Sequence, residues 1–318
     1  MPFPVLRGRW AATLTVLGAL TLTACGGGDS TPEPEEAREQ DSRQFSVDPS
    51  RLPFNAVADA PETDRWWGVL DGAGYRVEVP KNWNGMLVMY AHGYGGTGST
   101  VSVSDPPIRA HLIRNGYAWA ASSFSKNYYD VRAGIEDTNA LALAFQRIAT
   151  QNGRTLAPPA KTYIVGTSMG GHIAAAAVDA EALETANHKV RYDGSVPMCG
   201  VLGDTELYNY FGASQIAAQQ LAGMPATSWP VANWAELAPK VRSALFTTFP
   251  SATTPLGDQY KEIVKQLTGG ERPMFNEGFA GSMNATVWGT FGRDGTINGI
   301  LNRDGYDTTG IVYQFDND

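Results

Sequence analysis

The sequence has few cysteines, few histidines and a minority of basic residues. Two cysteines and four histidines occur in 318 residues, and no Cys/His pair has the spacing of a zinc site. Lys and Arg number 24 against 32 Asp and Glu, which gives a net charge of −8. Nucleic-acid binding needs clustered basic side chains, so we expect no nucleic-acid partner. The chain also lacks internal repeats and a Gly-rich phosphate loop, and we expect neither a metal nor a cofactor.

The rest of the composition is that of a folded protein. Hydrophobic residues make up 43% and charged residues 18% of the chain, values that exclude disorder for most of it. The length is enough for one large domain or two small ones. The 35 glycines, 19 prolines and 8 tryptophans indicate a loop-rich, aromatic-rich protein rather than a helical bundle.

Residues 1–24 have the pattern of an export signal. Arg7 and Arg9 precede an uncharged run that ends in Leu22-Thr23-Ala24-Cys25 and is short for a stop-transfer helix. The ending resembles the lipobox of bacterial lipoproteins. This resemblance implies that Cys25 carries lipid such as palmitate and anchors the protein in a bacterial cell envelope. The glycine after Cys25 favours the outer membrane. A plain signal peptide with an accidental cysteine is the alternative.

We expect residues 25–50 to form the lipidated cysteine and a disordered acidic tether. Six acidic residues and only two arginines occur in residues 26–44, without apolar periodicity. Such a segment buries too little surface to offset the entropy of ordering it.

Residues 51–200 alternate between strand and helix patterns, which predicts an α/β core with a mostly parallel sheet. Residues 86–91 form a continuous apolar run, as expected for a strand buried on both faces. The other predicted strands are 66–70 and 75–79 (a hairpin), 117–121, 163–165 and 193–198, and the predicted helices are 108–114, 132–150 and 172–186.

The pattern changes after residue 200. Helical segments at 207–221, 234–245 and 258–267 dominate, without a clear strand, so we expect residues 201–290 to be a helical cap over the carboxyl edge of the sheet. Residues 291–318, with one apolar run at 311–313, would return to the core.

A G-x-S-x-G motif spans Gly166 to Gly170 between a predicted strand and a predicted helix. In that context the pattern predicts a sharp turn that exposes the Ser168 hydroxyl as a nucleophile, with glycines where bulk would clash. The helix that follows would point its N–H groups at the site.

A second Gly-rich motif, His92-Gly93-Tyr94-Gly95-Gly96, follows the apolar strand at 86–91. Acyl transfer develops negative charge on an oxygen, which two backbone N–H donors must stabilise, and losing one donor costs about 2.7–4 kcal/mol. We predict that the amides of Met169 and Tyr94 are these donors.

These two motifs resemble those of the α/β-hydrolase superfamily, in particular its branch of secreted bacterial esterases and prolyl-oligopeptidase-like enzymes. Residues 66–200 carry the resemblance, which includes Gly-Ile-Glu-Asp-Thr at 134–138. It implies a doubly wound, mostly parallel sheet with a helical cap, a nucleophilic Ser168, and support of the oxyanion loop by His92 and Gly93.

The catalytic triad is incomplete in this sequence. The superfamily supplies its residues in the order Ser, acid, His, but only His172 and His188 follow Ser168. Three explanations stay open: a fragment lacking C-terminal βα units, which we favour, an inactive relative, or a histidine acting from an unusual position. The candidate acids, none of which can be assigned, are Asp204, Glu206, Asp304 and Asp307.

The sequence therefore predicts a membrane-anchored, extracytoplasmic serine hydrolase that cleaves a small or polymeric carboxylic ester. The alternatives are a prolyl-oligopeptidase-like peptidase, and an inactive fragment or ligand-binding surface lipoprotein of the same fold.

Overall fold

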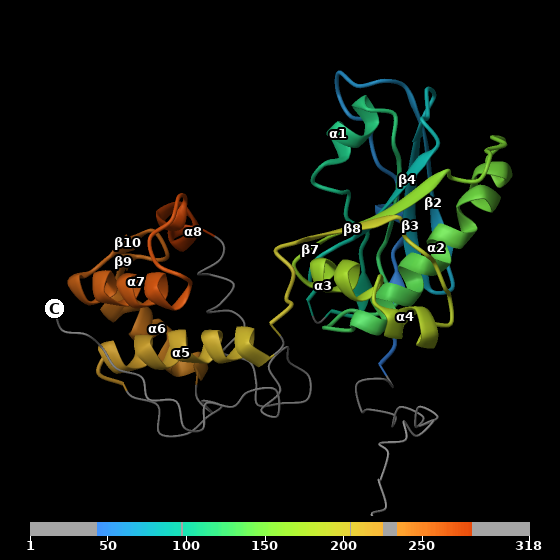
Figure 1. Cartoon of the computed structure of the whole chain (residues 1–318). Helices are drawn as coiled ribbons and strands as arrows, with labels where there is room; N and C mark the ends of the chain where they lie inside the picture. The colour runs from blue at the N-terminus through green and yellow to red at the C-terminus, as the bar shows by residue number, and fades with distance from the viewer. Residues whose placement is uncertain (1–42, 97, 204, 225–233, 282–318) are drawn as a thin grey trace, which may run out of the picture. The chain divides into compact units, whose positions relative to one another are not determined.

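The computed structural model describes residues 43–96, 98–203, 205–224 and 234–281. These residues form a sheet part, up to residue 203, and a helical part, from residue 205 onward, which we describe separately (Figure 1).

The sheet part is built on six strands in the order β2-β3-β6-β4-β7-β8. The first three strands in this order pair antiparallel, and the pairs from β6 to β8 are parallel. The six strands are β2 (Thr63–Leu70), β3 (Ala73–Pro80), β4 (Met86–Ala91), β6 (Ala118–Ser122), β7 (Lys161–Thr167) and β8 (Gly194–Met198). The mostly parallel sheet predicted from the sequence is confirmed.

The hairpin β2–β3 turns at Asp71 and Gly72, whose φ angles are 49° and 86°. Two consecutive positive φ values are typical of the two-residue turn that matches the twist of paired strands, and Asp-Gly is a favoured pair for it. The hairpin predicted from the sequence is therefore confirmed.

The core lies on both faces of β4, because successive side chains of a strand point to opposite faces. Leu87 and Met89 pack in the cluster that also contains buried residues of α2 (Val131–Gln151) and α3 (Met169–Ala176). Val88 and Tyr90 pack on the other face, with Leu112 and Ile113 of α1 (Arg109–Arg114). The uninterrupted apolar run at 86–91 thus reflects burial on both sides, as predicted.

The Ala-rich segment predicted as one helix, 172–186, forms two. Helix α3 ends at Ala176 and α4 spans Ala180–Thr185. Between them Asp179 is extended, with ψ at 150°, and its carboxylate accepts a hydrogen bond from the Glu181 amide. A side chain that caps a new helix competes with continuation of the old one, which explains the break.

The predicted tether also ends earlier than expected. Strand β1 (Ser46–Val47) pairs in parallel with β5 (Thr100–Val101), and a 3-10 turn follows at Pro49–Arg51. Residues 46–50 therefore belong to the folded body. Cys25 and tether residues 26–42 lie outside the described residues.

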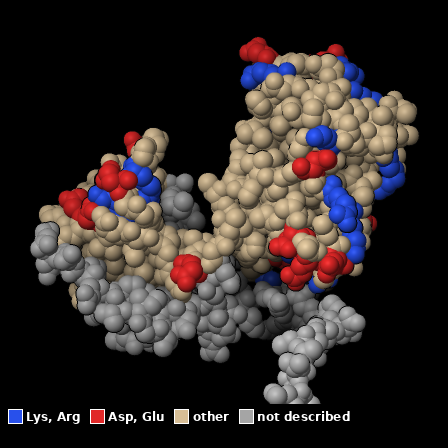
Figure 2. All heavy atoms as spheres, in the orientation of Figure 1, with Lys and Arg blue, Asp and Glu red and all other residues tan. Residues whose placement is uncertain are grey.

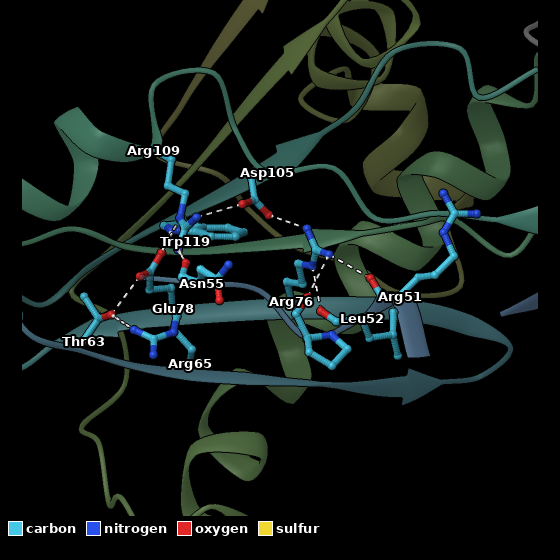
Figure 3. Close-up of polar contacts among 11 residues, drawn as sticks. Arg51, Leu52, Asn55, Thr63, Arg65, Arg76, Glu78, Asp105, Arg109 and Trp119 are labelled. Atoms are coloured by element: carbon cyan, nitrogen blue, oxygen red, sulfur yellow. Dashed lines mark hydrogen bonds and ion pairs between the residues drawn. The ribbon is translucent and has the colours of Figure 1, made fainter. Parts of the chain in front are cut away.

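An ion network fastens this N-terminal segment to the sheet (Figure 3). Glu78 of β3, fully buried, accepts hydrogen bonds from Arg109 at 2.7 Å, Trp119 at 2.8 Å and Thr63 at 2.7 Å. Arg109 also donates to the Asn55 carbonyl at 2.6 Å. A second arginine completes the attachment: Arg76 donates to the carbonyls of Arg51 and Leu52, each at 2.8 Å, and pairs with Asp105 at 2.7 Å.

The helical part contains α5 (Thr205–Leu221), α6 (Trp234–Leu245), α7 (Pro255–Leu267) and α8 (Phe275–Ala280). The first three confirm the predicted helices. A short antiparallel pair, β9 (Phe246–Thr248) with β10 (Ala252–Thr253), was not predicted, because neither strand is long enough to show a period-two pattern. A separate hydrophobic cluster holds these elements together, centred on Val241, Leu245 and Phe246.

These elements place the sheet part in the α/β class, with the strand–helix order expected of an α/β-hydrolase fold. On the face drawn in Figure 2, acidic and basic side chains form small separate groups between larger uncharged areas. Within the described ranges, no helix is long and apolar enough to cross a membrane. The predicted return to the core at 291–318 lies outside the described residues.

Candidate active site

Ser168 sits at the turn between β7 and α3, with φ at 59° and ψ at −119°. A residue with a Cβ rarely adopts positive φ, and such strain concentrates at functional sites. The residue is exposed, while Gly166 before it and Met169 after it are buried. The structure thus places Ser168 at an exposed, tight turn between a strand and a helix, and its role as a nucleophile stays a prediction.

The glycines of the motif allow the backbone to fold this tightly. A Cβ on Gly166 would overlap the carbonyl group of Gly170, and a Cβ on Gly170 would overlap the carbonyl group of Ala91. A side chain at position 170 would force the end of β4 away from the turn at Ser168, and one at position 166 would force β7 away from the first turn of α3. The predicted structural role of Gly166 and Gly170 therefore follows from close backbone contacts.

The loop after β4, which the sequence predicts to be an oxyanion loop, lies against Ser168. A Cβ built on Gly93 would be 3.3 Å from the Thr167 carbonyl oxygen, 3.4 Å from the Ser168 Cβ and 4.0 Å from its Oγ. Gly93 therefore lies beside the Ser168 side chain, and a Cβ added there would be tighter than usual only against the Thr167 carbonyl.

Two backbone amides near Ser168 were predicted as oxyanion donors. Met169 is the first residue of α3, so its N–H has no carbonyl partner within the helix. Tyr94 follows Gly93 in the loop, and its half-buried side chain packs against the same core as Met169. Their joint action on a substrate oxygen stays a prediction.

His92 braces the start of this loop. It is buried, its ring stacks on Phe124 with centroids 4.1 Å apart, and its Nδ1 lies 2.6 Å from the Gly93 carbonyl oxygen. Because the partner is a carbonyl, Nδ1 is the donor. Burial lowers the pKa of His92, although hydrogen bonds to the carbonyls of Gly93 and Ser123 oppose this shift. The ring is therefore held neutral in a supporting position.

The other three histidines have partners away from the Ser168 hydroxyl. The Nδ1 of His172, one helical turn beyond Ser168, lies 3.1 Å from the Tyr129 hydroxyl. The Nδ1 of His188 lies 3.3 Å from a carboxylate oxygen of Glu136, and His111 contacts Asn115. No hydrogen bond joins a histidine to Ser168 Oγ in the described part of the chain, so the general base is not identified.

The candidate acids stay unassigned as well. Asp204, Asp304 and Asp307 lie outside the described residues, and Glu206 is exposed in the first turn of α5.

Cys199, an exposed free thiol, follows Met198, whose carbonyl accepts a hydrogen bond from the Ser168 amide at 3.0 Å. No group of three or more metal-ligating side chains occurs among the residues that the structure places.

Sequence reasoning did not single out Asn127, which the structure brings to the oxyanion loop. Asn127 is 5% exposed, and its side chain donates hydrogen bonds to two carbonyls of that loop. Asn127 also lines a cavity of about 210 Å³ with Tyr90, His92, Gly93 and other residues of the loop. No local signal could have found it, because Asn127 comes from the segment between β6 and α2 and its partners follow β4.

Comparison with known proteins gives distant likenesses only. No protein-family model and no curated protein matches the chain. Similar solved structures include esterase B from Lactobacillus rhamnosis inhibited by a tributyrin phosphonate, with 22% identity and a TM-score of 0.30 over 42% of this chain and 48% of that one.

Two further structures are similar at this level. EstE5 shares 18% identity, with a TM-score of 0.34, over 59% of this chain and 56% of its own. A brefeldin A esterase, described as a bacterial homologue of human hormone-sensitive lipase, shares 17% identity, with a TM-score of 0.34, over 67% of this chain and 57% of its own. The chain thus spans about half the length of these structures, and likenesses so distant carry no argument about its activity.

Proposed function

We propose that this chain is a serine hydrolase that cleaves carboxylic esters through an acyl-enzyme on Ser168. The observation that carries the proposal is the exposed Ser168 at a strained strand–helix turn, with Gly93 of the loop after β4 lying beside its side chain. Strained backbone is retained where function requires it, and an exposed hydroxyl near backbone amides is the arrangement that acyl transfer needs.

The proposed chemistry has two steps. Ser168 Oγ attacks the acyl carbon, the substrate oxygen takes up negative charge opposite the amides of Met169 and Tyr94, and the alcohol leaves with a proton. Water then attacks the acyl-enzyme and releases the carboxylic acid. The group that accepts the serine proton is left open. An oxyanion site without a positioned base still accelerates acyl transfer by roughly 10³–10⁴-fold over water.

We further propose that the enzyme acts outside the cytoplasm, tethered by lipid on Cys25. The support is the charged-then-apolar start of the chain, its Leu-Thr-Ala-Cys ending, and the acidic segment that follows. Metabolic labelling with an alkyne fatty acid tests this proposal: wild-type protein should be labelled and Cys25→Ser should not. Labelling of Cys25→Ser would contradict it.

A fluorophosphonate probe tests the proposed nucleophile, because its phosphorus forms a stable bond to an activated serine. We expect a single adduct on the peptide that contains Ser168, and at least a 100-fold loss of labelling in Ser168→Ala. Ser50→Ala, which removes another exposed hydroxyl, should label as wild type does. No adduct on wild-type protein would overturn the hydrolase proposal and favour a ligand-binding role.

Model substrates test the ester preference. Wild-type protein should hydrolyse p-nitrophenyl acyl esters above the Ser168→Ala background, and it should leave prolyl anilides intact. Free imidazole should raise the ester rate if no side chain serves as the base. Faster cleavage of prolyl anilides would favour a peptidase instead.

A further inference from the structure

We propose that Asn127 is a positioning residue for the oxyanion loop. Its buried carboxamide holds residues 92–96 and 98–100 in a position from which the loop amides can donate hydrogen bonds to an oxygen of a substrate bound at Ser168. This inference rests on the proposed function and adds a residue that the motifs do not contain. Two contacts support it, the hydrogen bonds of the carboxamide and its close approach to Gly95, together with a cavity beside the loop.

The first contact is a pair of hydrogen bonds from one side-chain nitrogen. Asn127 Nδ2 donates to the carbonyl of Gly98 at 2.6 Å and to the carbonyl of Thr100 at 2.9 Å. The neighbouring backbone adds a third link, because the Tyr128 amide donates to the Gly96 carbonyl at 2.9 Å. Removing a buried donor leaves its acceptors unsatisfied, so the side chain matters more than its size suggests.

The second contact, between Asn127 and Gly95, explains why position 95 has no side chain. A Cβ built on Gly95 would lie 2.8 Å from Asn127 Oδ1, closer than a real Cβ contact. The carboxamide thus sits directly against the backbone of the loop, two residues after Gly93. Any side chain at position 95 would clash with the carboxamide of Asn127 in its present position.

The loop has few other side chains that could hold it in place. His92 fixes its start, while the loop has glycine at positions 93, 95, 96 and 98, whose lack of side chains leaves nothing there to pack. The cavity of about 210 Å³ that Asn127 lines leaves room for the loop to shift. Asn127 is therefore a side chain that ties the end of the loop opposite His92, next to the backbone pairing of Thr100 with Ser46. A shift of about 1 Å would take an amide out of hydrogen-bonding range of the oxygen.

The test compares Asn127→Ala with Asn139→Ala. Asn139 is an equally buried asparagine that also bonds a distant backbone, because its Nδ2 donates to the His188 carbonyl at 2.7 Å, but it does not touch the loop. We expect Asn127→Ala to slow fluorophosphonate labelling of Ser168 by 10- to 100-fold. The kcat for p-nitrophenyl acetate should fall by a similar factor, with KM changed by less than threefold. Asn139→Ala should lower the Tm and leave the labelling rate within threefold.

A second variant distinguishes a shift of the loop from a general loss of folding. Gly95→Ala keeps the carboxamide but pushes it away, so it should slow labelling in the wild-type background. In the Asn127→Ala background the same change should cost little more, because the contact is already lost. Additive losses in the double variant would show that the two residues act independently and would overturn the inference.

The outcomes separate the two proposals. If wild-type protein labels at Ser168 and Asn127→Ala labels equally fast, Asn127 does not position the loop and the hydrolase proposal stands. If wild-type protein does not label at all, both proposals fail. Hydrogen exchange at residues 93–100 gives an activity-independent reading: it should rise in Asn127→Ala but not in Asn139→Ala, and unchanged exchange would also overturn the inference.

Discussion

At the scale of single residues, the turn at Ser168 exposes this residue in a backbone conformation that lowers the stability of the fold. Ser168 holds a positive φ that glycine adopts at little cost, and holding such a conformation with a side chain costs of order 1–3 kcal/mol. This strain is what we expect if the proposed function needs the hydroxyl at that point.

Replacing Ser168 by glycine should therefore stabilise the protein. We expect Ser168→Gly to raise the free energy of unfolding by about 1 kcal/mol, less than the full strain because glycine gains freedom in the unfolded chain. Ser168→Ala should change it little, because alanine keeps the Cβ. Urea denaturation of both variants is the measurement, and a less stable Ser168→Gly would show that the turn is not strained.

The buried His92 should make stability depend on pH. Burial lowers its pKa in the folded protein below the usual value of about 6.5, so the unfolded chain binds a proton that the folded protein does not. The contribution of neutral His92 is thus present above pH 6.5 and is lost as the pH falls below that value. Between pH 7.5 and 5, wild-type protein should lose more unfolding free energy than His92→Asn. Parallel losses in the two proteins would contradict the shift.

At the scale of secondary structure, local signals placed most elements and missed their ends. The hairpin, the buried strand β4 and helix α2 follow from a turn signal and from apolar periodicity. The break between α3 and α4 depends on a cap at Asp179, which competes with the helical preference of the alanines around it.

The attachment of the N-terminal segment predicts a large effect of one carboxylate. Glu78→Gln would leave Arg109, only 14% exposed at its side chain, without its closest charge partner. Breaking a buried pair from one side costs about 3–5 kcal/mol. Lys81→Met removes an ion pair to Asp64 whose lysine is 51% exposed, and should cost less than about 1 kcal/mol. Chemical denaturation compares the two, and equal costs would show that the Glu78 network is not important for stability.

At the scale of the whole molecule, the described hydrophobic clusters fall into separate sets. Two clusters cover the two faces of the sheet, and a third lies within the helical part, with no buried residue in common. Clusters that share no residues can unfold with different free energies.

Leu245→Ala should therefore weaken the helical part alone. Leu245 is fully buried in the helical cluster, and such truncations cost about 2–5 kcal/mol. Hydrogen exchange should become faster in α5, α6 and α7 and stay unchanged in β4 and β7. Faster exchange in all of these elements would show that the chain unfolds as one cooperative unit.

The sequence by itself determined the strand–turn–helix around Ser168, the glycines that permit it and most elements of the sheet. These depend on local conformational preferences and periodicity, which neighbouring residues encode. Only the tertiary structure decided that Gly93 lies against Ser168, that Asn127 bonds the carbonyls of Gly98 and Thr100, and that Ser46–Val47 pairs with Thr100–Val101. The reason is that each of these contacts joins segments that folding of the sheet brings together, so no single stretch of sequence carries its signature.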